Sequence, residues 1–333
     1  MAIVKVENLS KEFHIRKRED GLLGALKGMF NNKKIIKKAV NNISFEINRG
    51  EIVGYLGPNG AGKSTTIKML SGILVPSKGS VEVKGVIPHR NRIENAKNLG
   101  VVFGQRTQLW WDIPVSESFS LMKHMYKIPK AQYKENIELF SDILGIADFY
   151  NTPVRQLSLG QRMRADLCAS LLHNPEILFL DEPTIGLDVV VKEKIRDFIK
   201  EINKVRKTTV ILTTHDMEDI EKLASRVMVI DNGSIMYDGK LDKLKDIYGT
   251  EESIQIEIES PISNFEELFK MGVNDISYEK NKIQIRYDKS CINSATIISW
   301  VMKKSKVKDF IVQGINADEV IRKMYKNPIK NLI

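Results

Sequence analysis

A glycine-rich loop near the start of the chain restricts the possible folds more than any other feature. It begins with the pattern G-x-x-x-x-G-K-[ST] and consists of Gly57, Pro58, Asn59, Gly60, Ala61, Gly62, Lys63, Ser64 and Thr65. An apolar strand-like run at 52–56 precedes it, and a helical pattern at 65–70 follows it. Glycines let such a loop wrap closely around a triphosphate, and backbone N–H groups supply partial positive charge. An ordinary glycine-rich turn is the alternative, and the flanking strand and helix argue against it.

Two carboxylates follow a second buried-strand pattern. Residues 177–180 are apolar and deliver Asp181 and Glu182 to the carboxyl end of a predicted parallel strand. We expect Ser64 and Asp181 to hold Mg²⁺, Lys63 to reach the outer phosphates, and Glu182 to polarise the attacking water. Adjacent carboxylates can also cap the next helix, so by themselves they leave both interpretations open.

Two further polar residues end predicted strands of the same sheet. His215 follows the apolar run 210–214, and Gln105 follows the run 101–103. Because the carboxyl ends of parallel strands share one edge, both would lie near the γ-phosphate. His215 would then sense phosphate and orient water, and the Gln105 amide would reach metal or water. A histidine after a strand is more often structural, and the glutamine alone means little.

The order of these motifs resembles the nucleotide-binding subunit of ABC transporters over about residues 3–240. Within that resemblance, residues 57–65 match the Walker A loop, Gln105 the Q-loop, 157–161 the signature, 177–182 Walker B, 186–188 the D-loop and His215 the switch histidine. The resemblance implies an ATPase that uses ATP and Mg²⁺. It also implies nucleotide contacts from Ser158, Gly160, Gln161 and Asp188. The implied fold is α/β: a P-loop ATPase at 1–240 with a mixed sheet core, an antiparallel β-subdomain and a helical subdomain at about 107–168.

Two positions depart from the family pattern. Leu159 stands where the signature most often has glycine, but Ser158, Gly160 and Gln161 are present, so we expect activity. The adenine-stacking aromatic residue is matched best by Phe13, although a long insertion separates Phe13 from the phosphate loop. The alternative for Phe13 is a place in the core.

The signature is best explained by a second copy of the chain. A helix beginning just after Gly160 would aim its N-terminus at an anion, but the phosphate loop already has a helix of its own. We therefore expect a head-to-tail homodimer, with ATP between Lys63 of one subunit and Ser158 of the other and with Asp188 crossing the seam. ATP binding would close this dimer, and hydrolysis would let it open.

Composition indicates a globular chain of about two domains, since 42% of the 333 residues are hydrophobic and 28% are charged. Cys168 and Cys291 have no metal-binding spacing and favour a reduced, cytoplasmic setting. The start of the chain does not resemble a signal peptide, and no apolar run approaches the roughly 18 residues that span a bilayer. We expect a subunit attached peripherally to the inner face of the cell membrane, beneath a separate multi-span permease.

The net charge of +9 is concentrated in an insertion at 16–38. This segment holds eight basic residues against Glu19 and Asp20, and it has an apolar face at helical spacing made of Leu22, Leu23, Leu26, Met29 and Phe30. Such a segment suits a membrane surface or a permease helix. The alternative is a solvated hairpin extension that packs its leucines on its own domain.

Residues 241–333 predict a second, accessory domain. A helical linker at 241–250 precedes strands at 253–258, 275–278, 282–287 and 308–313 and helices at 264–270, 292–302 and 317–325. The order β-α-β-β-α-β with a last helix favours a ferredoxin-like α+β domain. It would dimerise or restrain the subunits, or would simply be a stabilising cap.

Export is the favoured direction of transport, because the insertion and the signature resemble ATPases that export polysaccharides, drugs or viologen-like cations. Trp110 and Trp111 begin the stretch in which the family contacts its permease, and they are either interface anchors or core. Import remains a rival. Action on ribosomes or DNA would suit the pI near 9.2, but the paired ATPase domains or long coiled coils of those branches are missing, so we expect no nucleic-acid partner.

Overall fold

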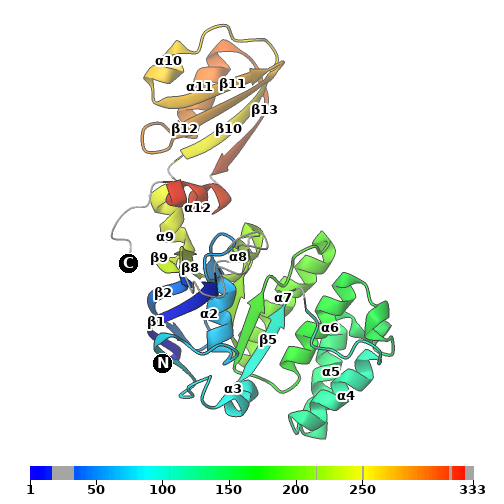
Figure 1. Ribbon diagram of the computed structural model, residues 1–333. Helices are drawn as coiled ribbons and strands as arrows, with labels where there is room; N and C mark the ends of the chain where they lie inside the picture. Colours follow the sequence, from blue (N-terminus) through cyan, green and yellow to red (C-terminus); the bar gives the residue numbers. More distant parts are fainter. Residues whose placement is uncertain (17–33, 105, 215, 250, 315–316, 327–333) are drawn as a thin grey trace, which may run out of the picture. The chain divides into compact units, whose positions relative to one another are not determined.

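The computed structural model describes residues 1–333 except 17–33, 105, 215, 250, 315–316 and 327–333 (Figure 1). The chain divides into two compact units, Met1–Asp238 and Gly239–Leu332. Among the described residues, no helix combines the length and the apolar character that crossing a membrane requires.

The first unit is built on a six-stranded sheet. Its strand order is β5 (Leu99–Phe103), β6 (Ile177–Asp181), β7 (Thr209–Thr213), β3 (Ile52–Leu56), β8 (Arg226–Asp231) and β9 (Ser234–Lys240). The pairs from β5 to β8 are parallel, and a two-residue turn joins β8 to the edge strand β9. Strands β3 and β7 are buried along their whole length, which explains their predominantly apolar sequences. The carboxyl ends of these five parallel strands therefore meet at one edge.

An antiparallel sheet packs against this core. Its order is β2 (Lys34–Asn48), β1 (Ala2–Arg16) and β4 (Lys78–Val83), and its buried residues share one hydrophobic cluster with β3, β6 and β7. Strand β2 begins at Lys34 and pairs with the end of β1. Residues 34–38, the last part of the predicted insertion 16–38, are thus strand. Residues 17–33, with the predicted amphipathic face, lie outside the described residues.

The helical subdomain lies next to the β5 edge of the large sheet (Figure 1). It contains α4 (Val115–Met125), α5 (Lys130–Leu144), two short 3₁₀ segments at Ile146–Phe149 and Val154–Gln156, and α6 (Leu159–Leu171). Pro114, Pro129 and Pro153 stand at the N-caps of three of these segments, which confirms their predicted punctuating role. The unit is completed by α2 (Lys63–Leu70), α3 (Arg92–Asn98), α7 (Val189–Arg206) and α8 (Met217–Leu223).

Two helix starts differ from the sequence prediction. Helix α6 begins at Leu159 rather than after Gly160, because Ser158 caps it: the Ser158 hydroxyl accepts from Gln161 N, and the Gln161 side chain accepts from Ser158 N. Helix α2 begins at Lys63 rather than at Thr65, directly after Gly62.

The second unit has the predicted ferredoxin-like fold. Helix α9 (Leu241–Tyr248) leads into β10 (Glu251–Ile258), α10 (Glu266–Lys270), β11 (Val273–Glu279), β12 (Lys282–Asp288), α11 (Ser294–Lys304), β13 (Val307–Gly314) and α12 (Ala317–Lys326). The sheet order is β11-β12-β10-β13, and every neighbouring pair is antiparallel. Alternate residues of β10 and β12 face α10 and α11 in a hydrophobic core of their own.

Candidate active site

The phosphate loop joins β3 to α2, and two of its glycines are required by close packing. Gly62 has φ of +114°, and a Cβ there would lie 2.4 Å from Ala39 O. A Cβ at Gly57 would lie 2.4 Å from Ile230 O. Both contacts are shorter than any side chain tolerates, so only glycine permits this path of the backbone. The loop is consequently fixed from behind by the antiparallel sheet and by β8.

Lys63 turns its ammonium group back over the loop. Its Nζ donates to Gly57 O at 2.5 Å and to Pro58 O at 3.2 Å. Burial lowers the pKa of Lys63, while the nearby Glu182 and Asp181 carboxylates oppose that shift. A buried ammonium group next to backbone N–H donors is well suited to bind a polyphosphate. The anion would replace the stabilising interactions with water that the ammonium group loses on burial.

Ser64 and Asp181 meet at the carboxyl end of β6. The Ser64 hydroxyl donates to Asp181 Oδ2 at 3.0 Å, and the Thr213 hydroxyl donates to Asp181 Oδ1. The carbonyl of Asp181 accepts from Gly104 N at 2.8 Å. Hydroxyl and carboxylate oxygens are the hard ligands that Mg²⁺ prefers, so this pair fits the expected metal. Thr213 was not predicted, although its place at the end of β7 beside Asp181 follows from the parallel register.

Glu182 has an unusual backbone. Its φ is +55°, a left-handed conformation that few residues other than glycine adopt. Its N–H donates to Thr213 O at 2.9 Å, and Gly104 packs so closely on the other side that a Cβ there would lie 2.4 Å from Glu182 O. This bend carries the chain out of β6 at the site edge of the sheet.

These residues line two adjoining clefts. One, of about 340 Å³, is lined by Phe13, Lys37, Ala39, Asn59, Gly60, Gly62, Lys63, Ser64, Thr65 and Glu182. The other, of about 660 Å³, shares Phe13, Ser64, Thr65 and Glu182 with the first and adds Asp181, Gly104 and Arg106 among others. The structure thus brings together the predicted loop, both carboxylates and the predicted aromatic residue.

Phe13 is not a core residue. Its side chain is 36% exposed, and Lys11 Nζ lies 5.4 Å from the ring centroid. An exposed ring at the wall of the cleft is available for stacking on a base. Gln105 and His215, by contrast, lie outside the described residues. In the sequence they directly follow Gly104 and Thr214, which come immediately after β5 and β7.

The predicted partner-facing residues sit elsewhere in the described part of the chain. Ser158, Gly160, Gln161 and Asp188 are absent from the lining of both clefts. Asp188 caps α7 by accepting from Val191 N at 3.0 Å. The two segments are neighbours, because a Cβ at Gly160 would lie 3.4 Å from Val191 and one at Gly186 would lie 3.2 Å from Leu159. Signature and D-loop therefore form one surface.

Comparison with known proteins shows the family to which this chain belongs. A family model described as "ABC transporter" matches residues 40–185. ABC transporter ATP-binding protein NatA of Bacillus subtilis is 34% identical over 65% of this chain and 87% of its own length. The chain belongs to the ABC transporter ATP-binding proteins. It is an ATPase.

Two other relatives match a larger share of this ABC ATPase than NatA does. Linearmycin resistance ATP-binding protein LnrL of Bacillus subtilis is 28% identical over 85% of the chain and 90% of its own length. Methionine import ATP-binding protein MetN 2 of Enterococcus faecalis is 28% identical over 94% of the chain and 87% of its own length. Both matches must therefore include residues beyond the first unit.

Solved structures agree with the fold. A structure titled "Dimeric structure of a post-hydrolysis state of the ATP-binding cassette MJ0796 bound to ADP and Pi" is 26% identical, with a TM-score of 0.58 over 71% of this chain and 98% of that one. A second, "Structure of ATP binding subunit of ABC transporter", has a TM-score of 0.62 at 20% identity over 74% of this chain and 93% of that one, and it supports the fold alone.

Proposed function

We propose that this ATP-binding subunit drives an exporter, works as a homodimer, and attaches to the cytoplasmic side of a separate membrane permease. The observation that carries the catalytic part of the proposal is the convergence of Lys63, Ser64, Asp181 and Glu182 at one edge of the parallel sheet. No covalent intermediate is needed, because phosphoryl transfer to water depends mainly on positioning and charge neutralisation.

Each residue in the cleft has a distinct task in this proposal. The loop amides and Lys63 hold the β- and γ-phosphates, and Phe13 stacks on the adenine. Glu182 accepts a hydrogen bond from the attacking water, and its carboxylate is aimed by the left-handed bend at the end of β6. Gln105 and His215 would contact the metal or water and the γ-phosphate. When Mg²⁺ is bound, Ser64 and Asp181 hold it, and it neutralises phosphate charge.

A second copy of the chain is proposed to complete each site. Leu159, Val189 and Val190 are exposed at 39%, 75% and 67%, and they flank Ser158 and Asp188 on the joint signature and D-loop surface. An apolar patch of this kind is better covered than left in water. In a twofold arrangement the same patch of each copy would face the nucleotide of the other, as in the head-to-tail dimer that the sequence predicts.

The permease contact is proposed at the start of the helical subdomain. Trp110 and Trp111 are exposed at 40% and 48%, so they are not core residues. Arg162 lies 5.6 Å from the Trp111 ring, which holds that ring at the surface. Half-exposed tryptophans supply large contact areas at protein interfaces.

The direction of transport is supported by names of relatives. LnrL is named for linearmycin resistance and DrrA3 of Streptomyces coeruleorubidus for daunorubicin resistance, while MetN 2 is named for methionine import. Export of a drug-like compound is our proposal. The second unit would be an accessory domain that restrains or dimerises the subunits.

A reconstituted transporter tests the direction. The subunit would be purified with its permease and placed in proteoliposomes with the ATP sites outward, with daunorubicin and methyl viologen as separate probes. Export predicts ATP-dependent accumulation of a probe inside the vesicles and stimulation of ATPase activity by that probe. Release of preloaded methionine with neither probe accumulating would show an importer instead.

A further inference from the structure

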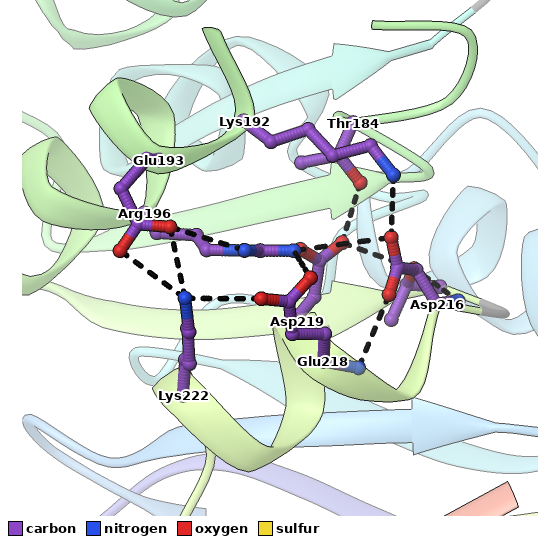
Figure 2. A network of polar contacts seen from close by, with 9 residues as sticks. Thr184, Lys192, Glu193, Arg196, Asp216, Glu218, Asp219 and Lys222 are labelled. Atoms are coloured by element: carbon purple, nitrogen blue, oxygen red, sulfur yellow. Dashed lines mark hydrogen bonds and ion pairs between the residues drawn. The ribbon is translucent and has the colours of Figure 1, made fainter. Parts of the chain in front are cut away.

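A cluster of charged side chains links α7 and α8 to the two strand ends that form the site (Figure 2). It contains three cations, four carboxylates and two threonines, and we call it the α7–α8 network. Its members are Thr184, Lys192, Glu193, Arg196, Thr214, Asp216, Glu218, Asp219 and Lys222.

Arg196 and Asp219 form the centre of the network. Both side chains are completely buried, and Arg196 Nε donates to Asp219 Oδ1 at 2.6 Å. The second oxygen of Asp219 accepts from the Thr184 hydroxyl and, at 3.3 Å, from the Thr214 hydroxyl. One carboxylate on α8 therefore ties together the segment after β6, the segment after β7 and helix α7.

A second set of contacts involves Asp216, beyond the end of β7. Lys192 Nζ donates to Asp216 Oδ2 at 2.6 Å, and Arg196 lies 3.8 Å from the same oxygen. Asp216 N donates to the Thr214 hydroxyl at 2.9 Å. Hydrogen bonds to Asp219 and Glu218 raise the pKa of Arg196 against the effect of burial, so the guanidinium stays charged.

Stability alone is a weak explanation for such a pair. Removing two charges from water has a large desolvation cost, and replacing a buried ion pair by apolar residues is often neutral or stabilising. The geometry also has a local consequence, because Thr184 is only two residues beyond Glu182. The left-handed backbone of Glu182 is fixed on both sides of the bend. On one side Glu182 N donates to Thr213 O, and on the other the Thr184 hydroxyl donates to Asp219. Such a conformation persists only where its surroundings fix it.

We propose that Arg196 and Asp219 are positioning residues for ATP hydrolysis, which hold the Glu182 segment, Thr214 and Asp216 in the geometry that the water-activating carboxylate requires. The proposal rests on the role proposed above for Glu182. It assigns to a buried ion pair, which is absent from the lining of both clefts, an effect on turnover that is separate from nucleotide binding.

The test uses two variants in the full-length protein, Thr184→Val and Asp219→Asn. Both should lower kcat on the order of 10-fold, as loss of a supporting hydrogen bond around a catalytic group typically does. The affinity for a fluorescent ATP analogue should stay at the wild-type value, because Lys63 and the loop are not altered. Thr184→Ser keeps the hydroxyl and should restore most of the turnover.

Matched controls lie at the opposite edge of the sheet. Thr209 is fully buried at the start of β7 and accepts from Gly50 N at 2.9 Å, and Asp238 pairs with Arg226 at the start of β8 at 2.7 Å. Thr209→Val and Asp238→Asn should lower the melting temperature but leave kcat per nucleotide-binding site unchanged.

Three results would overturn the proposal: wild-type kcat per binding site in Thr184→Val, a kcat loss as large in Thr209→Val, or a parallel loss of nucleotide affinity. If Asp219→Asn does not fold, the Thr184→Val and Thr184→Ser pair decides by itself. Normal turnover in Glu182→Gln would instead reject the proposed catalytic role of Glu182, so the two failures are distinguishable.

Discussion

Glu182 connects backbone conformation with chemistry at the scale of single residues. It follows a fully regular strand, yet its φ of +55° turns the chain sharply at the point where β6 and β7 end. Glu182 lines both clefts, and its charge opposes the lowering of the Lys63 pKa that burial causes. One residue therefore combines a strained backbone, a wall position in the cleft and a charge next to the loop cation.

Replacing Glu182 should separate chemistry from binding. We expect Glu182→Gln to bind ATP normally and to lower turnover on the order of 10²- to 10⁴-fold, because the amide cannot act as a general base. The measurement is phosphate release under saturating ATP together with a nucleotide-binding titration.

Lys63→Ala gives the contrasting result. It should abolish nucleotide binding, since it removes the cation that the loop carbonyls hold at 2.5 Å and 3.2 Å. Unimpaired hydrolysis by Glu182→Gln would exclude that residue as the group that polarises water.

The sequence predicted the chemistry-bearing residues better than the contacts that support them. Local patterns predicted Lys63, Ser64, Asp181 and Glu182, because each motif is short and adjoins a strand. Arg196 was missed because an arginine on an amphipathic helix is normally expected in water. The bend at Glu182 could not be predicted either, since it is imposed by Gly104, which follows β5, and by Thr213 of β7.

At the scale of elements, parallel strands and the β-α-β-β-α-β order were recognisable because both depend on periodicity along the chain. The start of α6 was predicted two residues too late. The Ser158-x-x-Gln161 pattern contains the capping-box signal, and its weight was assigned to nucleotide binding instead. The Ser158 and Gln161 side chains thus cap α6 within the subunit, and they are also proposed to contact the nucleotide of the neighbouring subunit.

His173 connects two helices of the helical subdomain to β5 and should make the stability of the first unit depend on pH. It follows α6, its Nε2 lies 2.9 Å from Leu99 O of β5, and its ring stacks on Tyr126 after α4 at 4.1 Å. Burial lowers the pKa of His173 to about 4. The unfolded chain therefore binds a proton at this histidine near pH 6.5, whereas the folded protein does so only near pH 4. The free energy of unfolding consequently decreases as the pH falls from about 6.5 to about 4.

Comparison with His173→Asn isolates this effect. Between pH 7 and pH 4 the variant should gain about 3 kcal/mol in unfolding free energy relative to wild type. Urea denaturation at a series of pH values, followed by circular dichroism, measures the difference. Asp166→Asn is the matched control of opposite sign, because burial raises the pKa of Asp166 to about 6. Parallel pH profiles for wild type and His173→Asn would contradict the prediction.

At the scale of the whole molecule, the two units have separate hydrophobic cores. The first core is shared by both sheets of the ATPase, and the second is confined to the ferredoxin-like unit. We expect a chain that ends at Lys240 to fold and to bind ATP with unchanged affinity, because β9 remains complete. Calorimetric nucleotide titration measures this. Loss of nucleotide binding in a soluble truncated chain would show that the second unit supports the site.

Pairing of two chains should control the rate. If the site is completed by a second copy, ATPase activity per subunit should fall on dilution, and Ser158→Arg should stop hydrolysis while each monomer still binds ATP. Activity across a dilution series, with the oligomeric state measured by analytical ultracentrifugation, provides the test. A demonstrated monomer that hydrolyses ATP at the full rate would reject the shared site.

The order of strands in the large sheet has a consequence for biosynthesis. Strand β3, which carries the phosphate loop, pairs on one side with β7 and on the other with β8, so that Ile52 meets Val210 and Leu56 meets Val229. While the ribosome is still making the intervening helices, β3 has neither neighbour, and such long-range pairing is slow and exposes apolar surface. The nascent chain thus emerges with the strand before its glycine-rich loop unpaired, and β3 can acquire both neighbours only after the strand containing Val229 has left the exit tunnel.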